Sequence, residues 1–302
     1  MRTTSITPSK AAPSAQHPEI PVNSGIEPRA PLGAGAVIGE SFSILLKNIV
    51  HVIVASAAPM ILFFLPIGFM IGSNQMLDLK APQFNWSVLL INFAISLFAM
   101  CAALSVSAAA VNKLAYDAKH LRTVKASTYL KSTLSAAPIV TLFTLAIGAA
   151  LLLVQVSIFA LSSVSPVLTF FTFPVFFVVY FWTVAACSLM PAVAVVEKAG
   201  LSSLKRSIAL TKGYRLPVLG TIFLAGLCSI AIQIAISIFT FLVTLTASLA
   251  SETLGAILSF ASSLVAFALM IGYLCIVTSL IYIRLREIKE GAGIDQIEAV
   301  FE

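Results

Sequence analysis

The residues best suited to chemistry in this sequence are four cations within Pro191–Gly220: Lys205, Arg206, Lys212 and Arg215. Ammonium and guanidinium groups bind phosphate, lysine as a point charge and arginine through paired hydrogen bonds. Apolar residues lie between these cations, as in segments that rest on an anionic membrane. The pattern therefore indicates a candidate site for the headgroups of anionic phospholipids.

A structural role for the same stretch is the alternative interpretation. Glu197 ends an apolar run, and Arg206 follows at a spacing that lets the two side chains pair across a bend. One helical face of the segment after the bend is apolar and carries Leu201, Leu204 and Ile208. The Thr211-Lys212-Gly213 sequence is typical of a helix end. An interfacial anchor with one local ion pair therefore stays open beside headgroup binding.

Catalysis and metal binding find no support in the residue pattern. The chain contains no G-x-S-x-G, Walker A or H-E-x-x-H motif. Its four cysteines lie inside apolar runs, and neither they nor the three histidines have the spacing of metal ligands. We therefore expect a non-enzymatic protein that uses no metal and no cofactor.

Within the long apolar runs the polar side chains are amides and hydroxyls, and Asp, Glu, Lys and Arg are absent. The lack of ionisable groups disfavours an ion-coupled pump. The amides either bond between helices or line a cavity for a solute, and they are Asn92, Gln155 and Gln233. Small residues four apart predict close helix packing instead, at Gly255, Ser259 and Ser263.

Membrane-spanning helices must position these groups, because the composition excludes an ordinary soluble domain. Hydrophobic residues make up 59% of the 302 residues and charged residues 10%, against about 45–50% and 25% in soluble domains. The net charge is +6. Since the cations adjoin apolar runs, we expect anionic lipid as the counter-charge and no nucleic acid.

The apolar runs predict an all-α, polytopic membrane protein with six transmembrane helices and short cytoplasmic interfacial helices. The predicted spans are about 51–73, 86–111, 138–161, 167–196, 217–248 and 254–283. No charge occurs between Ser132 and Val196, a stretch far longer than the ~20 residues of one span. The chain must turn back within it, and Ser162–Pro166 has the composition of a turn. A second tight turn is expected at Ser251-Glu252.

The distribution of Lys and Arg predicts the orientation. With six spans, 17 of the 18 basic residues fall on one side, so the positive-inside rule places both termini in the cytoplasm. Residues 1–38 are predicted to be a disordered cytoplasmic tail, 39–290 the membrane domain and 291–302 a second cytoplasmic tail. We expect a basic surface segment at 113–131. We also expect an interfacial helix at Gly39–Asn48, with an apolar face formed by Phe42, Leu45, Leu46 and Ile49.

The order P-x-V-x-V-V-E, then L-x-R-S-x-x-L-T-x-G, resembles the membrane domain of the glycerophosphoryl diester phosphodiesterase type. The resemblance implies a bacterial inner-membrane location and a structural motif formed by Pro191, Glu197, Leu204, Arg206, Ser207, Thr211 and Gly213. The phosphodiesterase domain itself is not recognisable here, so the hydrolase activity does not transfer. Arg284 also stands where the family pattern Y-x-D-L-R has an acid.

The sequence therefore favours a non-enzymatic membrane module of the bacterial inner membrane that engages anionic lipid or scaffolds a partner. A protein partner and a homo-oligomer are both compatible with this expectation. The alternative is a transporter or channel for a small or lipid-like solute, with the three amides around a cavity.

Overall fold

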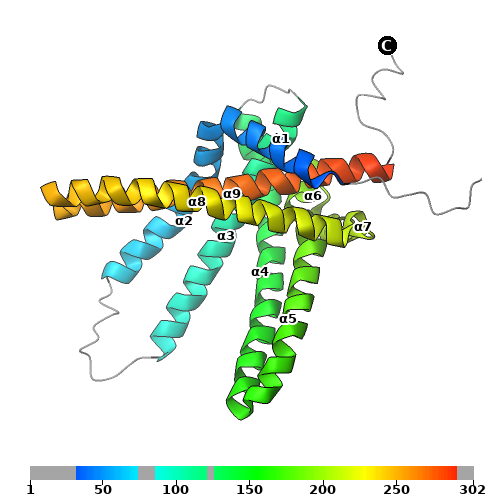
Figure 1. The fold of residues 1–302 in the computed structure, drawn as a ribbon, viewed down its shortest axis with the longest axis horizontal. Helices are drawn as coiled ribbons and strands as arrows, with labels where there is room; N and C mark the ends of the chain where they lie inside the picture. The colour runs from blue at the N-terminus through cyan, green and yellow to red at the C-terminus, as the bar shows by residue number, and fades with distance from the viewer. Residues whose placement is uncertain (1–31, 74–85, 121–125, 291–302) are drawn as a thin grey trace, which may run out of the picture. The chain divides into compact units, whose positions relative to one another are not determined.

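The computed structural model describes residues 32–73, 86–120 and 126–290, and every regular element within those ranges is a helix (Figure 1). In chain order these are α1 (Ala34–Lys47), α2 (Ile49–Ser73), α3 (Trp86–Lys119), α4 (Ala126–Val164), α5 (Pro166–Cys187), α6 (Met190–Val196), the 3-10 turn η1 (Gly200–Ser202), α7 (Ser203–Thr211), α8 (Arg215–Ala250) and α9 (Glu252–Glu290).

Five of the described helices are long and apolar enough to cross a membrane, or six if α1 and α2, bent by 85° at their junction, form one span. The predicted fold class is confirmed at this level: the protein is all-helical with several membrane-length apolar helices. Both predicted turns are also present. Ser165 alone joins α4 to α5, and Ser251 alone joins α8 to α9.

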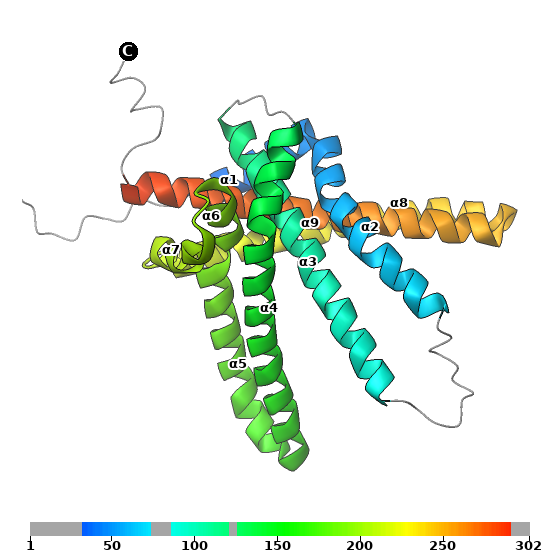
Figure 2. The same cartoon turned by 180° about the vertical axis from the view of Figure 1, so that it is seen from behind.

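Helices that follow one another directly pack side by side, as α4 with α5 and α8 with α9 (Figures 1 and 2). The central helix is α9, which contacts α1, α2, α3, α6, α7 and α8. Tyr273, Ile276 and Tyr282 on α9 are each at most 1% exposed. Through its contacts with α6 and α7, α9 also supports the two short helices that carry the structural motif.

Close approach of helices depends on two glycines of α9. A Cβ atom at Gly272 would lie 2.3 Å from Cγ1 of Val52 on α2, and a Cβ atom at Gly255 would lie 2.8 Å from Cβ of Ser248 on α8. Contacts this short do not occur between real side chains, so both glycines allow a packing that alanine would oppose. The close helix packing predicted at Gly255 therefore has a geometric basis.

The first helix differs from its prediction. It begins at Ala34 rather than Gly39, so residues 34–38 of the predicted tail are helical. Residues 1–31 of that tail lie outside the described residues. The predicted apolar face is divided, because Leu45 is 5% exposed, Leu46 is 67% exposed and Ile49 belongs to α2. The buried residues are Val37, Ser41, Ile44 and Leu45, because α1 packs against α9 and α8 rather than lying only on lipid.

Two further boundaries also differ. The predicted span 167–196 corresponds to one membrane-length candidate, Phe170–Val196, but its helix is interrupted at Ser188–Leu189. After the interruption α6 begins with Pro191 in its first turn, where the missing N–H of proline costs no helix bond. Residues 192–195 are buried, since α6 packs against α3 and α4. The segment 113–131 is not one surface helix either. Its ends belong to α3 and α4, while 121–125 lie outside the described residues.

Candidate functional site

The bend between α6 and α7 is built from residues in the left-handed backbone region. Lys198 has φ 52° and Gly200 has φ 57°, which turns the chain sharply within a few residues. Gly213, with φ 88°, follows α7 at the position where left-handed glycine commonly ends a helix. The helix end predicted from Thr211-Lys212-Gly213 is thus present, and α7 is a short helix between two sharp turns.

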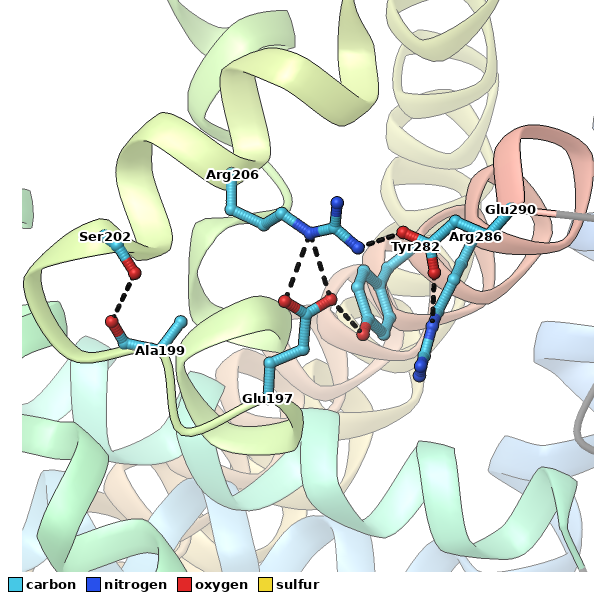
Figure 3. A network of polar contacts seen from close by, with 7 residues as sticks. All are labelled: Glu197, Ala199, Ser202, Arg206, Tyr282, Arg286 and Glu290. Carbon is cyan, nitrogen blue, oxygen red and sulfur yellow. Dashed lines mark hydrogen bonds and ion pairs between the residues drawn. The ribbon is translucent and has the colours of Figure 1, made fainter.

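Glu197, Arg206, Tyr282, Arg286 and Glu290 form a charged network that joins this bend to α9 (Figure 3). The Nε of Arg206 donates to Oε2 of Glu197 at 3.1 Å, so the expected ion pair is present. The hydroxyl of Tyr282 donates to Oε1 of the same carboxylate at 2.9 Å. Glu197 thereby accepts bonds from two elements that are distant in the sequence.

A second carboxylate completes the network. Glu290 pairs with the guanidinium of Arg206 and accepts a bond from Nε of Arg286 at 2.9 Å. Burial disfavours the charged form of Arg206, but hydrogen bonds to Glu290 and Glu197 outweigh this and raise its pKa. Glu290 lies seven residues beyond the predicted span of α9. Burial alone would raise its pKa, but the hydrogen bonds from Arg286 and Arg206 outweigh burial, so the pKa of Glu290 is lowered. Each charge is therefore stabilised by its partners.

Hydroxyl groups dock the inner face of α7. The hydroxyl of Ser207 donates to the carbonyl of Ala186 on α5 at 2.8 Å, and Thr211 donates to the carbonyl of Ser207 at 3.0 Å. From α9, Nζ of Lys289 donates to the carbonyls of Ala209 and Lys212 at 2.7 and 2.9 Å. Lys289 therefore satisfies carbonyls at the end of α7, as a cation near a helix C-terminus does.

The inner face of α7 carries hydroxyls beside the buried Leu210, and its outer face is partly apolar. Ser203, Ser207 and Thr211 are fully buried, while Leu201, just before α7, is 68% exposed and Ile208 38%. Lys205 and Lys212 are exposed on the same side. Neither lysine belongs to an ion pair within the described residues. Apolar and cationic side chains thus share the outer face.

The start of α8 extends this outer face. Leu216 is 72% exposed, and the guanidinium of Arg215 lies over the ring of Trp182 at 4.8 Å from its centroid. The buried Nε of Arg215 has no hydrogen-bond partner among the described residues. We call this outer face the α7 surface, and it consists of Leu201, Lys205, Ile208, Lys212, Arg215 and Leu216.

Of the four cations predicted to bind headgroups, three lie on the α7 surface and one does not. The guanidinium of Arg206 points away from it, toward two carboxylates (Figure 3). The predicted structural motif lies around the same bend. Leu204 packs against a cluster of buried residues from α3, α4 and α6.

The three predicted amides are not brought together. Gln233 on α8 lines a groove of about 1030 Å³. Asn92 on α3 does not line it, although Ser96, one turn further on, does. Gln155 is exposed on α4, away from this groove.

Sequence reasoning missed three residues of the site: Glu290, Lys289 and Trp182. The spacing of Tyr282, Arg286 and Glu290, four residues apart, places all three on one helical face. This spacing could have indicated Glu290 from the sequence. The contact of Lys289 with α7 could not have been predicted in this way, since Lys289 is 77 and 80 positions from the residues whose carbonyls it binds.

Comparisons with family models, with curated proteins and with solved structures find no match to this chain.

Proposed function

We propose that this protein is a non-enzymatic, multi-pass protein of the bacterial inner membrane that engages anionic phospholipid through the α7 surface. The resemblance of the motif around Glu197 and Arg206 to the membrane domain of the glycerophosphoryl diester phosphodiesterase type supports the location. The distribution of Lys and Arg supports a cytoplasmic position for α7 and for both termini.

The outer face of α7, which combines exposed apolar side chains with cations, carries this proposal. In water, an exposed face with Leu201, Ile208 and Leu216 would be unfavourable, and the buried hydroxyls would be better placed outside. At the boundary between headgroups and acyl chains, the same face can contact both kinds of lipid group. The leucines and isoleucine reach the acyl chains, and the cations reach phosphate.

Arg215 is the cation best prepared for phosphate. Its guanidinium stacks on the ring of Trp182, which restricts its orientation. Arg206 is excluded from this role because the charged network already uses its guanidinium.

The test is a double variant, Lys205→Gln with Lys212→Gln, compared with Lys47→Gln and Lys131→Gln. Both pairs remove two exposed lysines. At about 1 kcal/mol per lysine near an anionic leaflet, the α7 variant should lose phosphatidylglycerol affinity by roughly 30-fold. Native mass spectrometry in phosphatidylcholine micelles, with phosphatidylglycerol titrated in, measures this.

The control pair should change the affinity little, and added salt should weaken the wild type. Equal losses in both pairs would indicate only a general attraction of positive charge and would overturn the proposed site. Retention of a second protein by the wild type, with no phosphatidylglycerol, would favour the scaffolding role instead.

A transporter or channel is the second candidate, and the groove beside Gln233 is the observation that favours it. The separation of the three amides weakens it, because the predicted cavity required all three.

A further inference from the structure

The groove at Gln233 is distinct from the α7 surface. Its walls come from α2, α3, α8 and α9, and its residues lie within the predicted spans rather than near the ends. The volume of about 1030 Å³ is at the upper end of the range of ligand sites, roughly 300–1,000 Å³. In a bilayer this groove faces hydrocarbon, so its occupant must be soluble in the membrane.

Polar groups converge on this groove from two helices. Ser96 on α3 and Gln233 and Ser237 on α8 line it, and these three side chains form no hydrogen bond among the described residues. Thr240, Ser262 and Ser263 also line it, but their hydroxyls donate to carbonyls of their own helices. In hydrocarbon, unpaired amides and hydroxyls are unfavourable because no water replaces the missing bond.

The rest of the lining is apolar and partly aromatic, with Met60 and Phe64 from α2 and Phe260 and Phe267 from α9. Among the described residues that line the groove, none is Asp, Glu, Lys or Arg. A charged ligand would therefore lack a counter-charge in a medium of low dielectric constant. A wholly apolar chain would leave the amide of Gln233 without a partner.

We propose that the groove binds an uncharged, membrane-dissolved amphiphile, whose hydroxyl or carbonyl group bonds Gln233 and whose apolar body packs on the aromatic wall. This chemistry is that of a neutral lipid such as a diacylglycerol. Gln155 provides the contrast within the same chain. It is also an amide on a membrane-length helix, but it is exposed and lines no part of this groove.

The experiment uses a clickable, photoreactive diacylglycerol and its methyl ether, with the full chain in phosphatidylcholine nanodiscs. The free hydroxyl should direct labelling to peptides that contain Met60–Leu65 or Phe260–Phe267, and unlabelled diacylglycerol should compete. Gln233→Leu should reduce labelling about fivefold, as expected for the loss of one hydrogen bond. Gln155→Leu should leave it unchanged.

A second variant, Ser237→Phe, adds bulk to the lining and should also reduce labelling. Its phosphatidylglycerol affinity at the α7 surface serves as the test of folding, which keeps the two sites separable. Equal labelling by the methyl ether would mean that the groove does not recognise the hydroxyl and only packs acyl chains, which would overturn the proposal. Equal losses with Gln233→Leu and Gln155→Leu would likewise overturn the proposal.

Discussion

The helices α9 and α4 have nearly the same hydropathy but opposite surroundings. Their most apolar windows have mean hydropathies of 2.5 and 2.4, yet half of the α9 window is buried within the protein and only 6% of the α4 window. The difference lies in side-chain size and shape. Gly272 and Gly255 let α9 approach α2 and α8, whereas the outer face of α4 carries large residues such as Leu153. Hydropathy therefore does not distinguish a core helix from a peripheral one. A glycine matters where a neighbouring helix lies against it, as at Gly272, and not at Gly148.

The strongest test of this contrast exchanges one glycine in each helix for leucine. Gly272→Leu should destabilise the protein by about 3 kcal/mol, because its Cβ atom would lie 2.3 Å from Cγ1 of Val52, which is fully buried. Gly148→Leu in α4 should have little effect, since no atom lies within 4 Å of its Cβ position. Unfolding in mixed detergent micelles measures both. A similar loss of stability in the two variants would contradict the contrast between the packed helix α9 and the peripheral helix α4.

The second test concerns the charged network at the end of α9. Glu197→Gln should lower stability by about 2 kcal/mol, because it weakens the bonds from Arg206 and Tyr282 together. The matched variant is Glu287→Gln, whose carboxylate pairs only with Arg284 on the same helix among the described residues. We expect a loss below about 0.5 kcal/mol there. Cleavage near α7 by added protease should rise in the first variant alone.

The smallest expected effect is on the outer face of α4. Leu153 is 67% exposed, so Leu153→Ala should change stability by less than about 0.5 kcal/mol in micelles. A loss above about 1 kcal/mol would show that this face is covered in the native assembly. Cross-linking between differently tagged copies would then identify a second copy of the chain as the cover.

Much of the fold could be predicted from hydropathy and turn chemistry. The tight turns at Ser162–Pro166 and Ser251-Glu252 follow from local residues, as does the helix end at Gly213. The break at Ser188–Leu189 could not be predicted, since nothing in the composition distinguishes the buried residues 192–195 from a lipid-facing span. Burial against α3 and α4 is a tertiary property.

The candidate site was predictable where partners are close in the sequence. Glu197 and Arg206 are nine residues apart, and their pairing could be anticipated. The pairing of Arg206 with Glu290 could not be anticipated, because counting charges along the sequence does not show which cation meets a distant carboxylate. The pairing with Glu197 and Glu290 separates Arg206 from Lys205, and so distinguishes a structural cation from one available to lipid.

The bond between Tyr282 and Glu197 spans 85 positions of the chain, which has a consequence for biosynthesis. At about 5–20 residues per second, the ribosome adds Tyr282 roughly 4 to 17 s after Glu197. During that interval the acid beside α7 has no partner on α9, and Lys289 has not yet been made. Final docking of α7 therefore follows synthesis of the last long helix. Chains stalled or cut before Tyr282 should keep the contact of Ser207 with α5 but lack the bonds that tie α7 and Glu197 to α9.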